Sequence, residues 1–378
     1  MSNQPAVIGP DGVARPYIGG QALIEGVMMR SPHSFAVVVR RKSGNLVVRE
    51  QPMKDLRRGK RAWPLVRGVT ALVEALKLGS AALRFSADQF EKDLEQEEAA
   101  KKTASAGPST LAALSLPIIA LLTASPEELA ALDTGKQEPK RRLLGFLSAA
   151  FAIGVFVALP QAFAAGTSSL LGLGLDVRSV GFQLLTGSAK LTILIGYMLL
   201  IRRIPEIYRV FQYHGAEHKS IYTYESGEQL TVENARKKST LHPRCGTTFI
   251  VMVALVSIIV FSALGPLLPQ LGLGRLVDNL LFFALKLPFL PFVAALTFEL
   301  QRLLARYCSK GPGQILLWPG FLVQKITTIE PEDAQLEVAL SALLVTVVGE
   351  QPEERATVAT ERTFQDFAAL TQAPASAT

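Results

Sequence analysis

The chain has 378 residues, of which 49% are hydrophobic and only 19% charged, and its mean hydropathy is +0.29. This composition is too apolar for an ordinary soluble protein and indicates a membrane protein with more than one structural unit. The net charge of +7 comes without a nucleic-acid-binding motif, so no nucleic acid partner is expected, and two cysteines are too few for a disulfide framework.

The N-terminal region, residues 1–87, is predicted to contain both strand and helix. Residues 1–16 lack the apolar core of a cleavable signal peptide, so the N-terminus is expected to stay where it is made. Two apolar, β-branched runs, Phe35–Lys42 and Leu46–Gln51, flank Ser43-Gly44-Asn45. This arrangement predicts a β-hairpin.

A basic run follows the hairpin and leads into an amphipathic helix. Pro64 suits a first helical turn, and apolar residues from Leu65 to Leu83 recur at helical spacing. A basic stretch beside such a helix fits an anionic inner leaflet, and packing on its own domain explains the pattern equally well. The basic residues are Arg57, Arg58, Lys60 and Arg61.

Residues 88–140 begin with an acidic run and continue with Ala, Ser, Lys and Pro. This composition is poor at building a core and predicts a variable, disordered linker. Within it, Leu111–Leu122 is apolar but too short to span a bilayer and is interrupted by Pro117. A short helix is expected there.

Four apolar windows in residues 141–330 approach the roughly 20 residues that a helix needs to cross a bilayer. They are Leu143–Phe163, Val180–Ile201, Thr247–Leu268 and Leu280–Leu300. The second contains Lys190 and the fourth contains Lys286 with two prolines, so either a kinked or a re-entrant form is open for them. A transport path and snorkelling are the alternatives for the two lysines.

The distribution of Lys and Arg predicts the orientation. Residues 1–142 hold 21 of them, residues 202–246 hold 8 and residues 301–378 hold 6. The connections 164–179 and 269–279 hold one each, Arg178 and Arg275. By the positive-inside rule, both termini and the 202–246 loop face the cytoplasm.

The last part of the chain is predicted to return to the cytoplasm. Trp318-Pro319-Gly320 is an aromatic and turn combination suited to the headgroup level. Pro331 then opens a helix, predicted over residues 331–349, whose apolar residues from Leu336 to Val347 follow helical spacing. Residues 350–378 lose periodicity and predict a disordered tail.

The 202–246 loop contains the motif H-x-x-E-H, formed by His214, Glu217 and His218. On a helix, residues four apart share a face, so both histidines can bind one divalent ion, with zinc the best fit, while Glu217 acts as general base. The bland alternative is a pair of polar residues at the membrane interface. Gly215 weakens such a helix by roughly 1 kcal/mol relative to Ala, which puts the shared face in question.

A catalytic zinc site takes a third protein ligand, and His242-Pro243-Arg244-Cys245 supplies two candidates. His242 is preferred because imidazole suits zinc, and Cys245 comes second, since a site that bound all four residues would be closed. Glu233 and Glu225 are further oxygen donors. A different chemistry is also open, in which a nearby histidine activates Cys245 as a nucleophile or the cysteine is inert.

Several longer motifs resemble the YqhQ-like family of bacterial integral membrane proteins, a domain of unknown function. They include Gly19-Gly20-Gln21-Ala22-Leu23-Ile24-Glu25-Gly26-Val27-Met28-Met29-Arg30, Arg67-Gly68-Val69, Phe211-Gln212-Tyr213-His214, Leu230-Thr231-Val232-Glu233 and His242-Pro243-Arg244-Cys245-Gly246-Thr247. The resemblance covers about residues 16–348. It implies a multi-pass inner-membrane protein with the general label of a predicted metal-dependent enzyme, and it adds Glu25 and Arg30 as candidate site residues.

The sequence therefore predicts a mainly α membrane protein with about four transmembrane helices and a small cytoplasmic α+β portion that includes the hairpin. The expected function is that of a membrane-anchored, metal-dependent hydrolase with Glu217 as base and ligands drawn from His214, His218, His242 and Cys245. The alternative is a non-catalytic membrane scaffold or chaperone-like factor that binds a protein partner. The bilayer itself is the other expected partner.

Overall fold

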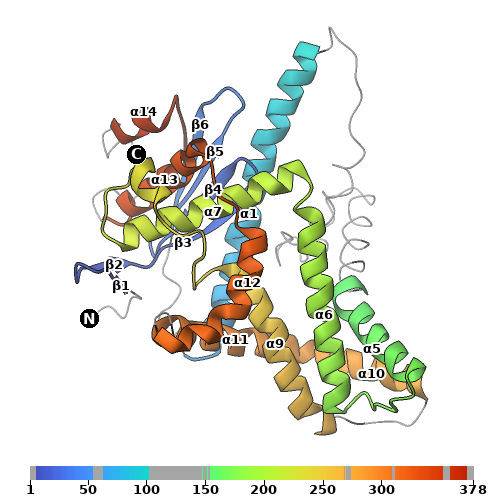
Figure 1. The fold of residues 1–378 in the computed structure, drawn as a ribbon. Helices are drawn as coiled ribbons and strands as arrows, with labels where there is room; N and C mark the ends of the chain where they lie inside the picture. Colours follow the sequence, from blue (N-terminus) through green and yellow to red (C-terminus); the bar gives the residue numbers. More distant parts are fainter. Residues whose placement is uncertain are drawn as a thin grey trace.

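The computed structural model describes residues 6–53, 63–101, 154–267, 274–308, 311–351 and 358–372, together with residues 147, 151 and 269. The basic run at 57–61, the short helix expected at Leu111–Leu122 and most of the predicted linker lie outside the described residues. Figure 1 shows two parts, a sheet with its covering helices and a set of long apolar helices.

The sheet is an antiparallel meander of five strands in the order β3-β4-β5-β6-β7. The strands are β3 (Gly19–Leu23), β4 (Gly26–Arg30), β5 (Ser34–Arg40), β6 (Leu46–Pro52) and β7 (Thr360–Phe364). The predicted hairpin is confirmed as β5 and β6, which pair from Ser34↔Pro52 to Arg40↔Leu46. A separate small hairpin joins β1 (Ala6–Ile8) to β2 (Ala14–Pro16).

Both faces of the sheet are buried, because its strands carry apolar residues at successive positions. On β5, Ala36 and Val38 face a core shared with helices α7 (Pro205–Glu225) and α13 (Asp333–Val348). Phe35, Val37 and Val39 face the other way, onto Ala82 and Phe85 of the long helix α1 (Val66–Lys101). The result is a helix–sheet–helix sandwich (Figure 1).

The predicted linker is wrong for residues 88–101, which continue α1. Asp93 of the acidic run helps to hold this helix on the sheet. Asp93 pairs with Arg41 at 2.6 Å and accepts the backbone N–H of Lys42 at 3.1 Å, and Gln89 accepts a second bond from Arg41. Nearer its start α1 packs on a different partner, α11 (Leu290–Tyr307), where Gly68 approaches Ala295 and Arg67 pairs with Glu299.

The predicted tail is wrong for residues 358–372. Strand β7 adds to the sheet beside β6, with Arg49 and Glu361 paired at 3.0 Å, and helix α14 (Phe367–Gln372) follows it. Leu370 is fully buried in the core under α13. The predicted C-terminal helix itself is confirmed, since α13 begins two residues after Pro331 with a capping box between Glu332 and Gln335.

Three helical segments are long and apolar enough to cross a membrane among the described residues. They are α6 (Val180–Ile201), Gly246–Leu267 and Leu280–Tyr307, with mean hydropathies of 1.8, 2.6 and 2.0. These match the second, third and fourth predicted windows. In the first window, residues 143–153 lie outside the described residues except for Leu147 and Phe151. A span at Leu143–Phe163, in addition to these three, therefore stays a prediction.

The apolar segments are built from shorter pieces. Residues of the first window continue as η2 (Gly154–Ala158) and α5 (Leu159–Leu170), and Gly246–Leu267 comprises α9 (Gly246–Leu264) and η3 (Gly265–Leu267). The last segment contains parts of α10 (Arg275–Lys286), the turn η4 (Leu287–Phe289) and α11. The turn at Pro288 confirms an interruption of this window.

Two short connections complete the chain near the sheet. Helix α8 (Val232–Arg236) follows α7, with Thr231 as its N-cap, and leads to the start of α9. After α11, η5 (Gly311–Leu317) leads into α12 (Trp318–Thr327), so Trp318-Pro319-Gly320 opens a helix rather than a turn. Helix α12 packs along α9 and ends beside α7, between the two parts of the molecule (Figure 1).

Candidate metal centre

Helix α7 is continuous through the H-x-x-E-H motif, so the two histidines do share a face. Gly215 has a packing role that offsets its low helix propensity. A Cβ atom at this position would collide with the backbone carbonyl oxygen of Ile329, in the segment after α12. The backbone N–H of Ile329 donates to the carbonyl of Phe211 at 3.0 Å, so Gly215 permits a direct backbone contact between α7 and this segment.

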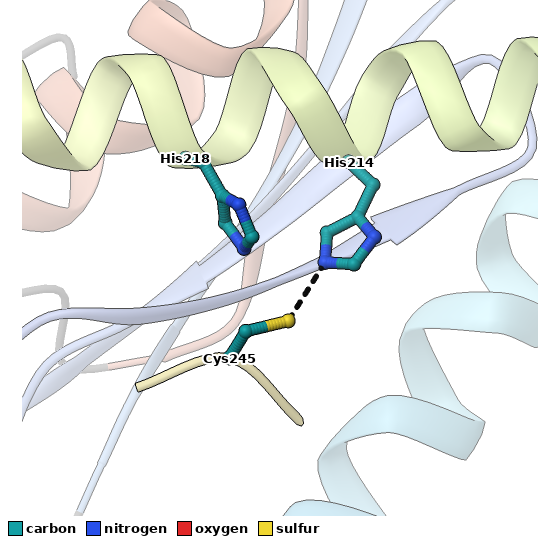
Figure 2. Close-up of side chains that lie close together, drawn as sticks. All are labelled: His214, His218 and Cys245. Carbon is teal, nitrogen blue, oxygen red and sulfur yellow. Dashed lines mark hydrogen bonds between the residues drawn. The ribbon is translucent and has the colours of Figure 1, made fainter. Parts of the chain in front are cut away.

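His214, His218 and Cys245 form a cluster whose possible ligand atoms all lie within 4.8 Å of one another. Figure 2 shows the two imidazoles extending from α7 toward the cysteine, which stands at the start of α9. His214 Nε2 and Cys245 Sγ are 3.1 Å apart. The cluster therefore joins the sheet side of the molecule to the first residue of an apolar helix.

Backbone carbonyls fix both imidazole rings. His214 Nδ1 lies 2.9 Å from the carbonyl oxygen of Thr327, and His218 Nδ1 bonds the carbonyl oxygen of Thr240. Because a carbonyl can only accept, Nδ1 carries the proton in each ring, and Nε2 points into the cluster. His218 Nε2 is buried there without a hydrogen-bond partner among the described residues.

Cys245 is placed as the N-cap of α9. Its sulfur accepts the backbone N–H of Thr247 at 3.4 Å, and its own carbonyl accepts a bond from Gln301 of α11 at 3.1 Å. The pKa of the thiol lies well below its usual range: burial opposes ionisation, but the positive charge of His214 and His218 outweighs it. The pKa of His214 is correspondingly raised, since the charge of Cys245 outweighs burial.

His242 is buried beside the cluster but lies outside it. Its ring centroid is 5.6 Å from that of His218, and its Nε2 faces the Glu225 carboxylate at 3.6 Å. Its Nδ1 accepts the backbone N–H of Arg244 at 3.4 Å, and burial lowers its pKa to about 4. The geometry thus brings Cys245 rather than His242 to the histidine pair, and the preference for His242 as third ligand stays a prediction.

Gln324 of α12 holds the backbone of the 242–245 loop. Its side-chain oxygen accepts the N–H of His242 at 2.7 Å, and its nitrogen donates to the carbonyl of the same residue at 2.8 Å and to Thr248 at 2.6 Å. Sequence reasoning missed Gln301 and Gln324. Each is a lone glutamine in or beside an apolar segment, and this polar residue in apolar surroundings was the sequence signal available. The backbone carbonyls of Thr240 and Thr327 have no such signal in the sequence.

The sequence profile of a family described as a protein of unknown function, DUF1385, matches residues 63–348. The chain belongs to the DUF1385 family. It is also 32% identical over 331 residues to "Uncharacterized protein YqhQ" from Bacillus subtilis (strain 168), an alignment that covers 86% of this chain and 91% of that protein. No solved structure matches the chain. The whole cluster lies inside the range that matches DUF1385.

Glu217, the acidic residue of the H-x-x-E-H motif in this DUF1385 chain, is buried against β3. A Cβ at Gly20 would lie 2.7 Å from its Oε1, so the glycine at this strand position makes room for the carboxylate. Burial raises the pKa of Glu217, although the charges of His214 and His218 partly offset this. Among the described residues no hydrogen bond to this carboxylate is found.

The remaining candidates lie elsewhere in the DUF1385 fold. Glu25, in the tight turn between β3 and β4 with a φ of 52°, bonds Arg209 at 2.6 Å and Tyr213 at 3.2 Å, which ties the turn to α7. Arg30 pairs with Glu74 of α1 at 2.6 Å, and Glu233 pairs with Lys237 on the surface at 3.1 Å. The contacts of Glu25 and Arg30 link separate elements of the fold, whereas Glu233 is exposed on α8.

Proposed function

We propose that this protein is a membrane-anchored, metal-dependent hydrolase whose ion is held by His214, His218 and Cys245. The observation that supports this most directly is Nε2 of His218, which is buried, has no hydrogen-bond partner in the described part of the chain, and lies beside another imidazole nitrogen and a thiolate sulfur. Burying a polar atom without a partner costs free energy, and an ion at the centre would remove that cost.

The donor set fits a divalent transition metal, with zinc the best match. Imidazole nitrogen and thiolate are the ligands that zinc prefers, and neighbouring ligand atoms of a tetrahedral zinc lie roughly 3.3–3.6 Å apart. His214 Nε2 and Cys245 Sγ are already 3.1 Å apart, and all three donors are within 4.8 Å. Three protein ligands leave one position open, as in catalytic rather than structural sites.

Glu217 is the residue that we assign to proton transfer. A divalent ion in such a site supplies Lewis-acid activation at neutral pH. The carboxylate lies on the same helix as both histidines, interacts electrostatically with them and is excluded from bulk water. In hydrolysis it would accept the proton of the attacking water and deliver it to the leaving group.

The arrangement of the chain supports a four-span topology with the site on the cytoplasmic side. Strands β3–β6, α7 and α13 share one core, so they lie on the same side of any bilayer. The chain must then cross an even number of times between α1 and α7, and again between α7 and α13. Between α7 and α13, the segments Gly246–Leu267 and Leu280–Tyr307 give two crossings. Between α1 and α7, α6 gives one crossing, and the predicted span Leu143–Phe163 would supply the second.

Metal analysis of the detergent-purified full-length protein tests the proposal. We expect a stoichiometric transition metal in the wild type and its loss from the His214→Ala/His218→Ala double variant and from Cys245→Ser. His33→Ala and Cys308→Ser are matched controls, because His33 pairs with Glu350 and Cys308 lies outside the cluster. Equal metal content in wild type and the double variant would reject the metal site.

The 3.1 Å contact between His214 Nε2 and Cys245 Sγ favours a second candidate, thiol chemistry with Cys245 as nucleophile. Alkylation of the metal-free protein by iodoacetamide distinguishes the two. Protection of Cys245 by added zinc, with no effect on Cys308, supports the metal site. Rapid alkylation that zinc does not change supports the nucleophile. A chain that neither binds metal nor reacts at Cys245 fits the scaffold alternative.

A further inference from the structure

A second buried polar cluster lies among the apolar helices, and the proposed hydrolase function does not use it. Lys190 of α6 and Lys286 at the end of α10 line the same cavity of about 30 Å³. Polar side chains from three helices share its wall: Gln161 of α5, Gln183 of α6 and Ser257 of α9. Helices α5, α6, α9 and α10 converge here, in the part of Figure 1 farthest from the sheet.

Neither lysine has an acidic partner among the described residues. Lys286 Nζ donates to Gln183 Oε1 at 2.9 Å and lies 4.4 Å from the ring centroid of Phe282 and 5.1 Å from that of Phe261. No hydrogen bond or ion pair of Lys190 is found in the part of the chain that the structure describes. Within that part, no Asp or Glu lines the cavity.

Two lysines in one apolar cavity can both stay charged only if a negative charge compensates them, because burial favours the neutral amine. Removing a single ammonium from water costs several kcal/mol unless it is paired, and like charges in a low-dielectric interior add to that cost. An amide oxygen and two aromatic faces offset only part of it. The chemistry that completes such a site is an oxyanion, which accepts hydrogen bonds from both lysines and from the amide and hydroxyl groups around them.

We propose that Lys190 and Lys286 bind the phosphate group of an anionic ligand between α5, α6, α9 and α10. The cavity volume suits one small group, whereas pockets for whole drug-sized molecules run to roughly 300–1,000 Å³. Leu287 and Leu290, which line the cavity, are 41% and 38% exposed on the outside of the bundle. The phosphate of a lipid, with its chains against these leucines, and a free phosphate ion share this chemistry.

The cavity is distinct from the His/Cys cluster. Lys190 lies eleven residues before the end of α6 at Ile201, which corresponds to roughly 17 Å of helix. The cluster lies beyond that end, on α7. Under the proposed topology, Lys190 therefore lies near the middle of its span, about half the helix away from the cytoplasmic end.

Two binding measurements on the full-length protein in detergent test this site. In the first, the thermal unfolding midpoint is followed as potassium phosphate replaces potassium chloride at constant ionic strength. In the second, native mass spectrometry compares phosphatidylglycerol with diacylglycerol, which has the same chains and no phosphate. We expect a rise of roughly 2–4 °C in the first arm if the source is free phosphate, or selective retention of phosphatidylglycerol in the second if it is lipid.

The variants are Lys190→Met, Lys286→Met and, to keep the charge, Lys190→Arg with Lys286→Arg. The methionine variants should lose at least tenfold in affinity for whichever probe the wild type binds, and the arginine variant should retain binding even if a methionine variant fails to fold. Lys325→Met, at an exposed lysine of α12, is the control and should not change binding. Equal binding by wild type and folded methionine variants, or no binding of either probe, would overturn the proposal.

Discussion

The two buried polar clusters of this protein differ in what surrounds their functional atoms. In the His/Cys cluster, carbonyls of Thr240 and Thr327 orient both imidazoles, and the possible ligand atoms of His214, His218 and Cys245 lie within 4.8 Å of one another. In the lysine cavity, Lys190 and Lys286 line the same wall, and the groups that contact Lys286 are a neutral amide oxygen and aromatic rings. The two clusters therefore suit ligands of opposite charge: imidazole nitrogens and a thiolate suit a cation, and two lysines suit an anion.

The largest effect is expected from Gly215→Ala, which breaks the frame of the His/Cys cluster. The new methyl group would meet the carbonyl oxygen of Ile329, and backbone atoms in a packed segment cannot move aside cheaply. We expect a loss of more than about 3 kcal/mol in the free energy of unfolding. Thermal unfolding in detergent measures it.

Gly196→Ala is the matched control for this prediction. Gly196 lies within α6, and a Cβ there would meet nothing within 4 Å. Alanine should therefore leave stability unchanged or raise it by up to about 1 kcal/mol. A similar loss in both variants would show that helix propensity, not the contact with Ile329, decides the outcome.

Glu50→Gln tests the cost of an unmatched buried charge in the sheet. Burial raises the pKa of Glu50 from 4.5 to about 7, and Arg362 at 3.4 Å only partly offsets it. The folded state thus holds the proton more tightly than the unfolded state, so wild-type stability falls as pH rises from about 4.5 to about 7 and stays level above. The glutamine variant lacks this fall.

We expect Glu50→Gln to be more stable than wild type at pH 8, by at most about 3 kcal/mol, with no difference near pH 4. The measurement is the unfolding midpoint of both proteins across that pH range. Glu361→Gln is the control, because Glu361 is a partly exposed carboxylate on the neighbouring strand. A constant difference at all pH values would show that Glu50 stays ionised in the fold.

Gln324→Leu tests whether residues that hold the His/Cys cluster in place, without being candidate ligands, affect metal affinity. The substitution removes three hydrogen bonds that hold His242 and Thr248, so the loop that carries Cys245 loses its anchor. Loss of a residue that hydrogen-bonds and orients a metal ligand typically lowers metal affinity by about 10- to 100-fold. A competition titration with a zinc chelator measures this, and Gln229→Leu, at an exposed position, should behave as wild type.

The smallest effect on stability is expected from Lys190→Met. Methionine keeps the unbranched chain and removes one of two like charges, so the free energy of unfolding of the phosphate-free protein should stay within about 1 kcal/mol of wild type or rise. His218→Ala, tested beside it in the presence of zinc, should lose stability. If the lysine variant were the more damaged of the two, the contrast between the clusters would fail.

Local patterns predicted the elements that depend on neighbours in sequence. Periodicity was sufficient for β5 and β6, for α13 and for the three apolar segments, and the spacing of His214 and His218 placed both on one helix face. Strand β7 could not be predicted this way. Its residues, Thr360–Phe364, become a strand only because β6 offers an edge some 310 residues earlier.

The same distinction applies to the site. The pattern of Cys245 near two histidines suggested a shared site, but the choice between Cys245 and His242 depends on ring orientation. Backbone carbonyls orient His214 and His218, and the backbone N–H of Arg244 bonds the ring of His242. The role of Gly20 depends on how closely β3 approaches Glu217. Such contacts arise from tertiary packing and have no local signature.

The pairing of β6 with β7 also sets an order of events during synthesis. The edge of β6 is available from the first 52 residues onward, while its partner follows every apolar segment of the chain. Helix α13, which covers one face of the sheet, is likewise made late. Until the apolar helices have been made, the N-terminal strands therefore have an open edge and one incompletely covered face. The sheet can be completed only after the membrane part has been synthesised.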